Sequence, residues 1–268
     1  MQWEELTAPD FAKAVKDTGV CVIAIGSLEK HFDHLPIGTD YLNGHRLCCL
    51  AAEREPAVVF PPYYIAQIHE SRPFPGCVAL PPTMTLEVLQ AVCDEIARNG
   101  FKKILIYNAH GGNWAMLNYL LQVHLSERRD YGIYLLRHLF PPTPDWASQW
   151  DDILETAVHE HACECETSIT LANFPELVKM DALQGRKADP NPRLAHLSPG
   201  NITAEWYAKF PDHYAGDATV ASIEKGQKLL ELQVQALAHY IGVVKKDTAL
   251  AGVLNEFYDR CDEVGGSN

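Results

Sequence analysis

Six consecutive apolar residues, Val20-Cys-Val-Ile-Ala-Ile25, run directly into the pair Gly26-Ser27. The run is rich in β-branched residues and shows no polar alternation, which is typical of a strand buried on both faces of a parallel sheet. The preceding residues 3–18 predict a short helix, capped by Thr7 or Asp10 and ended by Gly19. A helix followed by a buried strand indicates the opening of an α/β domain.

The loop behind this strand contains three side chains that suit a metal ion, Glu29, His31 and Asp40. Glu29 and His31 are two positions apart, so in an extended segment both side chains point the same way and can reach one ion or two adjacent ions. Two carboxylates and an imidazole favour a borderline divalent cation such as Zn, Mn or Fe. An isolated Glu-x-His is more often part of a polar surface loop, so other segments must decide between the two interpretations.

Further strands and helices alternate along the chain. The pattern predicts helices over 41–54, 85–100 and 114–128, and strands over 57–62, 101–108 and 131–138. Between the third strand and its helix lies the glycine turn Ala109-His-Gly-Gly-Asn113. Because ligands collect where such turns leave the carboxyl ends of parallel strands, we expect His110 beside Glu29, His31 and Asp40.

A second group of ionisable residues occurs in His159-Glu-His-Ala-Cys-Glu-Cys-Glu166. The HExxH zinc motif is excluded because position 163 is Cys. The backbone here can be helical or extended, and the sequence leaves that open. One carboxylate could simply cap the helix that follows, but three ionisable groups within six positions favour a functional role for His161 and Glu166.

Composition restricts the class of protein. The chain has 268 residues, 47% of them hydrophobic, and a formal charge of −13, which argues against nucleic acid or an anionic membrane as a partner. It lacks a secretory signal pattern and an apolar run of roughly 18 residues. Eight cysteines are too few for a disulfide scaffold, and we interpret Cys163 and Cys165 as packing residues rather than ligands. We expect one cytoplasmic domain over residues 1–268 that acts on a small molecule.

Four motifs follow one another in a fixed order: Gly26-Ser-Leu-Glu-Lys-His31, Leu35-Pro-Ile-Gly-Thr-Asp40, Asn108-Ala-His-Gly-Gly-Asn113 and His161-Ala-Cys-Glu-Cys-Glu-Thr-Ser168. Together with Gly216-Asp-Ala-Thr219 near the end, they resemble the creatinine amidohydrolase (creatininase) family over most of the chain. The resemblance implies a three-layer α/β/α fold with a mainly parallel central sheet. It also implies two divalent metal ions per subunit, hydrolysis of carbon–nitrogen bonds in small or cyclic amides, and a homo-oligomer, commonly a hexamer.

The resemblance also assigns roles to single residues. It implies five metal ligands, with Asp40 as the bridge between the ions: Glu29, His31, Asp40, His110 and Glu166. Creatininase itself has Tyr-Glu where this chain has Gly111-Gly112, so Glu166 is expected to supply the missing carboxylate, with Glu164 the next candidate. His161 is expected to move a proton to the leaving group, and Glu164 to orient His161 or to act as base.

The substrate stays open at this point. Relatives with the Gly-Gly version include a formamidopyrimidine deformylase, a peptide-trimming enzyme and a hydrolase of a diketo-inositol ring. Hydrolysis of an amide or formamide is the leading hypothesis, and cleavage of a cyclic β-diketone or a non-catalytic metal-binding subunit are the alternatives. Some aromatic residues in the expected loops 61–84 and 141–158 could form a pocket wall or contact a neighbouring subunit, while core packing is the role expected for most of them: Tyr63, Tyr64, Phe74, Trp146 and Trp150.

Overall fold

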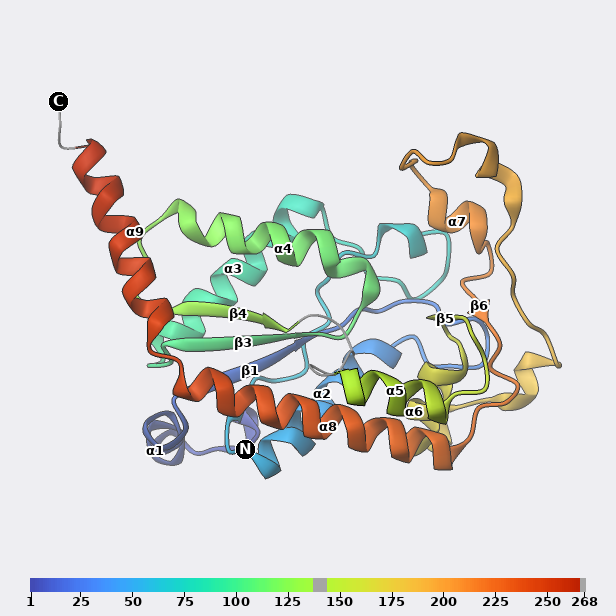
Figure 1. The fold of residues 1–268 in the computed structure, drawn as a ribbon, viewed down its shortest axis with the longest axis horizontal. Helices are drawn as coiled ribbons and strands as arrows, with labels where there is room; N and C mark the ends of the chain where they lie inside the picture. The colour runs from blue at the N-terminus through green and yellow to red at the C-terminus, as the bar shows by residue number, and fades with distance from the viewer. Residues whose placement is uncertain (137–143, 266–268) are drawn as a thin grey trace.

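A four-stranded parallel sheet forms the centre of the computed structural model, which describes residues 1–136 and 144–265 (Figure 1). The strand order is β2-β1-β3-β4, with β1 and β3 paired over six residues, from Val20 opposite Lys103 to Ile25 opposite Asn108. The strands are β1 (Val20–Ile25), β2 (Val58–Val59), β3 (Lys103–Asn108) and β4 (Gly132–Leu136). Every residue of β1 is buried, as its apolar run predicted.

Helices cover both faces of this sheet. One face packs against α1 (Ala8–Thr18), α3 (Pro82–Arg98) and α4 (Trp114–Val123), and the other against α2 (Thr39–Arg54) and α8 (Ile223–Lys246). Alternate residues of β1 enter the two cores, with Ile23 on the first face and Val22 on the second. The predicted three-layer α/β/α architecture is therefore confirmed.

The first helix shows how closely local signals set the element boundaries. Thr7 is its N-cap and accepts a hydrogen bond from the backbone N–H of Asp10, while Gly19 ends it in the left-handed region with φ 68°. Both signals were visible in the sequence. Residues 3–5 form a separate 3-10 turn rather than part of the helix.

A smaller antiparallel pair, β5 (His159–His161) with β6 (Ala215–Gly216), lies beyond the carboxyl ends of the central strands (Figure 1). The helix that follows β5, α6 (Glu164–Asn173), packs closely on α8. A Cβ at Gly226 would lie 1.8 Å from the carbonyl oxygen of Ser168, so only glycine permits this approach. This contact packs the middle of α6 against the first turn of α8.

Three further helices and seven 3-10 turns complete the described fold. The helices are α5 (Pro144–Ile153), α7 (Glu205–Lys209) and α9 (Ala249–Gly265). The 3-10 turns are Trp3–Glu5, His69–Ser71, Gly111–Asn113, His124–Ser126, Pro175–Leu177, Met180–Leu183 and Pro192–Leu197. Among the described residues, no helix combines the length and apolar character that crossing a membrane requires.

The prediction of an irregular segment over 141–158 is wrong for its central part, because residues 144–153 form α5. The aromatic and proline residues there obscured the helical pattern. Residues 137–143, which include part of the predicted fourth strand, lie outside the described residues, as does the side chain of Trp146. The C-terminal helix α9 was not predicted; it extends away from the sheet at the end opposite β5 and β6 (Figure 1).

Candidate metal centre

Adjacent strands bring the predicted residues of the first loop and the glycine turn together. Ile25 and Asn108 are paired at the ends of β1 and β3, so Glu29 and His110 leave the sheet at the same edge. Asn113 joins the two strand ends, because its side-chain amide donates to the carbonyl of Ile25 at 3.1 Å. The expectation that His110 lies beside Glu29, His31 and Asp40 is met in the structure.

Asp40 lies in the first turn of α2, where a carboxylate also complements the helix dipole. Its Oδ1 is 3.0 Å from Nε2 of His31, and its Oδ2 is 2.9 Å from Nδ1 of His110. The hydroxyl of Ser27 donates to Oδ2 at 2.7 Å and holds the carboxylate in this orientation. Each oxygen of Asp40 therefore faces a different histidine.

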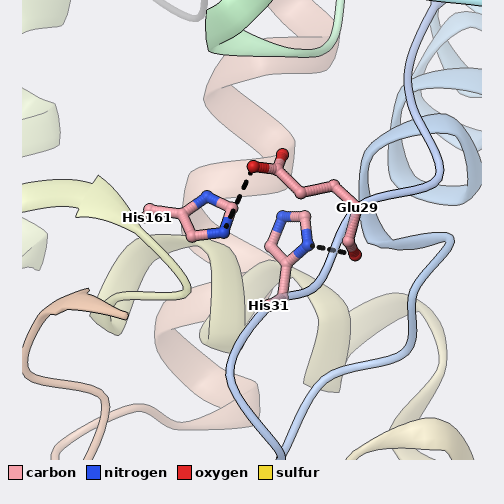
Figure 2. A group of neighbouring side chains, drawn as sticks. All are labelled: Glu29, His31 and His161. Carbon is pink, nitrogen blue, oxygen red and sulfur yellow. Dashed lines mark hydrogen bonds and ion pairs between the residues drawn. The ribbon is translucent and has the colours of Figure 1, made fainter. Parts of the chain in front are cut away.

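The described residues contain three groups of ligand-type atoms within 4.8 Å of one another. These groups are Glu29 with Asp40 and His110, His31 with Asp40 and Glu166, and Glu29 with His31 and His161. Figure 2 shows the last group, in which the rings of His31 and His161 lie 4.2 Å apart. We call the six residues of these groups the central cluster: Glu29, His31, Asp40, His110, His161 and Glu166.

Backbone carbonyls anchor one ring nitrogen of each histidine in the central cluster. His31 Nδ1 lies 3.1 Å from the carbonyl oxygen of Glu29, His110 Nε2 lies 2.9 Å from that of Gln67, and His161 Nε2 lies 2.8 Å from that of Lys30. A carbonyl oxygen only accepts, so these nitrogens carry the N–H. In the neutral rings of His31 and His110, the nitrogen that faces the carboxylates then carries a lone pair, which is the tautomer that binds metals.

Oε2 of Glu29 and Nε2 of His31 are buried and make no hydrogen bond. His110 and Asp40 lie 3.0 Å from them, but the N–H of each ring points to a backbone carbonyl, so lone pairs face lone pairs. Glu29 is only 3% exposed and His31 only 1%. Orphaned buried acceptors are costly unless a proton or a cation lies between them. Carboxylate oxygens and imidazole nitrogens that converge in this way fit a divalent metal ion of the Zn, Mn or Fe type.

The protonation preferences of the cluster follow from the same charges. Burial alone would lower the pKa of the His31 imidazole, but Asp40, Glu166 and Glu29 outweigh it and raise that pKa to about 10. Burial opposes ionisation of Asp40, yet His31 and His110 hold the pKa of its carboxyl below the usual range. The buried carboxylates are therefore stabilised by nearby positive charge, which either protonated imidazoles or metal ions can supply.

Glu166 and Glu164 lie in the same first turn of α6 and face different surroundings. Oε2 of Glu166 accepts from the backbone N–H of Ala162 at 2.5 Å and lies 3.8 Å from Nε2 of His31. Glu164 is fully buried, and its carboxylate contacts Nζ of Lys225 at 2.5 Å and the backbone N–H of Thr156 at 2.8 Å. The structure brings Glu166 into the cluster and leaves Glu164 out of it. The roles expected for Glu164, as orienting group, base or fifth ligand, therefore find no support in its contacts.

The sequence left open whether residues 159–166 are helical or extended, and the structure contains both conformations. His161 ends the extended strand β5, whereas α6 begins at Glu164 with Cys163 as its N-cap. Ala162 between them has a positive φ of 51°, and this bend separates the two conformations. Burial is the main cause that lowers the pKa of His161, and Glu29 opposes it.

Both thiols of the Cys-Glu-Cys segment pack inside the protein. Cys163 and Cys165 contact an apolar cluster that includes Trp150, and burial raises the pKa of Cys163 to about 12. These contacts agree with their interpretation as packing residues.

The aromatic residues of the expected loops have several different environments. Tyr63 and Trp150 are buried in cores of their own chain, which is the packing role expected for most of these aromatic residues, and they form no exposed pocket wall or subunit contact. Tyr64 is exposed, and Phe74 is half-buried with its ring 4.7 Å from that of His213. Their neighbours in space, not their place in a loop, decide their exposure.

A cavity of about 300 Å³ opens over the central cluster. It is lined by five cluster residues that the sequence predicted (Glu29, Asp40, His110, His161 and Glu166), together with Glu70 and Trp206, which it did not predict. Gly112 is also part of the wall. A Cβ there would lie 2.5 Å from Nε2 of His110 and 2.9 Å from Oε1 of Glu70, whereas a Cβ at Gly111 would meet nothing within 4 Å. The second glycine of the pair therefore gives His110 and Glu70 the space they occupy.

Sequence reasoning also missed His213. This residue is fully buried, and its Nδ1 lies 3.4 Å from Oε1 of Glu29. Glu70, Trp206 and His213 are single residues outside any recognisable spacing, so no sequence pattern could have selected them.

The geometry agrees with the comparison to known protein families. The model of the creatinine amidohydrolase family matches residues 4–241. The chain belongs to the creatininase family. It is therefore a hydrolase, and the resemblance inferred from the four motifs is confirmed.

Three named proteins are similar to this chain along most of their length. The creatinine amidohydrolase of Pseudomonas putida is 28% identical over 257 residues, covering 88% of this chain and 94% of that protein. The mycofactocin precursor peptide peptidase of Mycolicibacterium smegmatis is 27% identical over 226 residues, covering 82% and 83%. The 3-dehydro-scyllo-inosose hydrolase of Thermotoga maritima is 23% identical over 272 residues, covering 91% and 82%.

Solved creatininase structures share the fold. A mutant creatininase of the Zn-Zn type aligns with a TM-score of 0.77 at 24% identity, covering 92% of this chain and 98% of that chain. A manganese creatininase aligns with a TM-score of 0.75 at 24% identity, covering 92% and 99%. The creatininase-like α/β fold is thus established for this chain.

Proposed function

We propose that this protein is a dinuclear metal-dependent hydrolase that cleaves the carbon–nitrogen bond of an amide or formamide in a small compound, cyclic compounds included. The observation that carries the proposal is the position of Asp40. Its two oxygens belong to two ligand groups, one with Glu29 and His110 and the other with His31 and Glu166. A carboxylate shared in this way suits a bridge between two ions.

The metal identity is proposed as Zn, Mn or Fe. The mixed carboxylate and imidazole donors favour these ions over Ca²⁺, which prefers oxygen ligands alone. Relatives described as a Zn-Zn creatininase and a manganese creatininase support the same choice. When bound, such ions lower the pKa of water toward neutrality and polarise a carbonyl group.

His161 is proposed to transfer the proton to the leaving nitrogen. It lines the cavity beside Glu29, and its Nε2 is fixed by the carbonyl of Lys30. In the neutral ring, Nδ1 is then free to exchange a proton. Glu164 is not included in this proposal, because Lys225 and Thr156 occupy its carboxylate.

The cavity supports a small substrate that carries no negative charge. Its volume of about 300 Å³ is at the lower end for ligand sites. Among the described residues that line it, five are carboxylates and none is Lys or Arg: Glu29, Asp40, Glu70, Glu160 and Glu166. Two divalent ions would bring four positive charges against these five carboxylates, so the cavity would keep a net negative charge and repel an anionic group. A neutral or cationic amide fits these walls best.

Ring-opening of a cyclic β-diketone is the second candidate. The relative from Thermotoga maritima, named as a hydrolase of 3-dehydro-scyllo-inosose, supports it. The same ions would stabilise an enolate in place of a tetrahedral oxyanion.

Chelation followed by metal add-back tests the proposal. The protein is stripped with a chelator, reloaded with Zn, Mn or Fe, and assayed against amides, formamides and a cyclic β-diketone. We expect amide or formamide turnover that disappears on stripping and returns with metal. Full turnover by the stripped protein would contradict the proposal, turnover of the diketone alone would favour the second candidate, and tight metal binding without any turnover would favour a non-catalytic binding subunit.

We also propose that the protein is a cytoplasmic homo-oligomer, with a hexamer favoured. The support is the family resemblance and exposed Tyr64 beside Tyr41, with ring centroids 5.9 Å apart. Light scattering coupled to gel filtration, over a dilution series that reaches nanomolar concentration, tests it. A monomer with full specific activity would contradict it.

A further inference from the structure

A second, smaller cavity adjoins the cavity over the central cluster. Its volume is about 50 Å³, and residues of α2, β3, α6 and α8 form most of its wall, with Tyr107 and Gln233 among them. The two cavities share Asp40, Ala109 and Glu166. We call the smaller one the interior cavity. It therefore reaches two of the candidate metal ligands from a second side.

Gln233 places an amide in the wall of the interior cavity, at a position of α8 where apolar side chains are the rule. Leu229 and Leu237, one helical turn to either side, are fully buried, and Gln233 itself is only 6% exposed. Its Nε2 is buried and makes no hydrogen bond with the described residues. A buried amide without a partner destabilises a protein, so this amide needs a partner in the cavity.

Two further polar groups of the same wall make no hydrogen bond within the described part of the chain. One is the hydroxyl of Tyr107, a residue that is only 4% exposed, and the other is Oε1 of Glu166, whose bond from the backbone runs to Oε2. The amide of Asn43, by contrast, donates to Thr170 at 2.9 Å and accepts from Asn173 at 2.9 Å. An amide, a hydroxyl and a carboxylate oxygen thus line one small cavity and remain unpaired.

We propose that the interior cavity is a water-binding site, in which water held by Gln233 and Tyr107 donates a hydrogen bond to Glu166. A volume of about 50 Å³ exceeds the roughly 15 Å³ that one water molecule requires, and the wall offers the polar partners that a buried water needs. The water accepts from Nε2 of Gln233 and from the hydroxyl of Tyr107, and it donates to the carboxylate. Every group keeps its ordinary protonation state in this arrangement.

The water site makes Gln233 a positioning residue for Glu166. This step rests on the proposed function, since it assumes that the group of Glu166, His31 and Asp40 binds an ion. Partners behind the ligands of metal sites fix ligand orientation, and losing one typically costs about 10–100-fold in affinity. The substrate cavity can then fill and empty while Glu166 keeps this support from the interior side.

The test compares Gln233→Met and Tyr107→Phe with wild type. Methionine has nearly the length of glutamine and lacks the amide, while phenylalanine lacks only the hydroxyl. The matched control is Gln90→Met, which makes the same substitution at a residue that is 7% exposed in α3, on the other face of the sheet. Crystal structures of the zinc-loaded and the stripped proteins report water in the cavity. Zinc affinities are measured by competition with a chromophoric chelator, and melting temperatures on the stripped proteins.

We expect wild type to hold at least one ordered water bonded to both Gln233 and Glu166, with or without zinc. In Gln233→Met this water should be lost, the melting temperature should fall, and one zinc ion should bind about tenfold more weakly. Tyr107→Phe should change the same quantities in the same direction by less. Gln90→Met should keep the water and both zinc affinities.

A dry interior cavity in wild type would overturn the inference. A higher melting temperature of Gln233→Met would also overturn it, since removing a buried amide that has no partner stabilises a protein. Loss of the water with unchanged zinc affinities would overturn the positioning role of Gln233. A wild-type protein that binds fewer than two ions would instead refute the dinuclear proposal, and the structures of the stripped proteins would still decide whether the cavity holds water.

Discussion

Two glutamates two positions apart, Glu166 and Glu164, show what distinguishes a metal-binding region from a structural one. Glu164 faces Lys225, Thr156 and the backbone of Glu155, so its negative charge is fully compensated within the protein. Glu166 faces His31, whose Nε2 is buried without a hydrogen-bond partner. One carboxylate has all its partners and the other belongs to a group that requires a cation. Residue type and spacing therefore do not decide whether a glutamate is structural or metal-binding. A cationic side chain within hydrogen-bonding distance, as Lys225 is for Glu164, decides it.

We expect the largest effect from Asp40→Asn, because Asp40 belongs to the same ligand group as Glu166. The substitution keeps the size of the side chain and removes the charge that both ligand groups share. We expect both ions to be lost or greatly weakened, and turnover to fall by about 10³-fold or more. Metal counting by plasma emission, together with turnover assays, checks this. Two tightly bound ions in Asp40→Asn would show that Asp40 is not the bridge.

Glu166→Gln should affect one ion only. Because Glu166 belongs to the group with His31 and not to the group with His110, we expect the metal content to fall by about one ion per chain. Turnover should fall by about 10²-fold, since one of two electrophilic centres is removed. The matched comparison is Glu164→Gln, which we expect to retain both ions. Full occupancy in Glu166→Gln would place the fifth ligand elsewhere.

The glycine pair offers an internal control with a smaller effect. Gly112→Ala places a Cβ 2.5 Å from Nε2 of His110, so the ring must shift, whereas Gly111→Ala meets nothing within 4 Å. We expect about a tenfold loss of turnover or zinc affinity in Gly112→Ala, comparable to the loss of a supporting contact at a metal site. Gly111→Ala should stay within about twofold of wild type. Equal behaviour of the two variants would mean that the space beside His110 at Gly112 is not needed by the centre.

The smallest effect on turnover is expected for Glu164→Gln, which should instead reduce stability. Removing one partner of a buried ion pair costs about 3 kcal/mol. Lys225 keeps a second partner in Glu155 at 2.6 Å, so the loss should lie at the lower end of the usual range. Thermal unfolding by calorimetry, compared with turnover of the same sample, checks this. A large loss of turnover with unchanged stability would restore the catalytic role that the sequence suggested for Glu164.

The sequence predicted the fold well where its signals are local. The buried run at Val20, the cap at Thr7 and the stop at Gly19 each act within a few residues, and the structure confirms them. The helix over 144–153 was missed because Trp150 belongs to a core formed with a distant segment, the cluster that contains Leu229 and Leu232 of α8. Its pattern depends on contacts that are far apart in sequence.

The same distinction applies to the metal centre. Residues in ordered motifs, such as Glu29, His110 and Glu166, could be predicted as candidates because the motifs resemble those of the family, and the structure brings them into the central cluster. His213 and Glu70 could not, because their proximity to Glu29 and His110 arises only when β6 and the 61–84 segment fold over the sheet edge. The separate roles of Glu164 and Glu166 depend on the position of Lys225, 61 residues further along the chain.

The most direct test of two ions bridged by Asp40 is a crystal structure of the zinc-loaded protein with anomalous scattering recorded at the zinc edge. We predict two anomalous peaks per chain, one among Glu29, Asp40 and His110 and the other among His31, Asp40 and Glu166. Ions about 3.5–4 Å apart would match a two-metal site. A single peak, or a peak at Glu164 and the Cys163–Cys165 segment, would contradict the account.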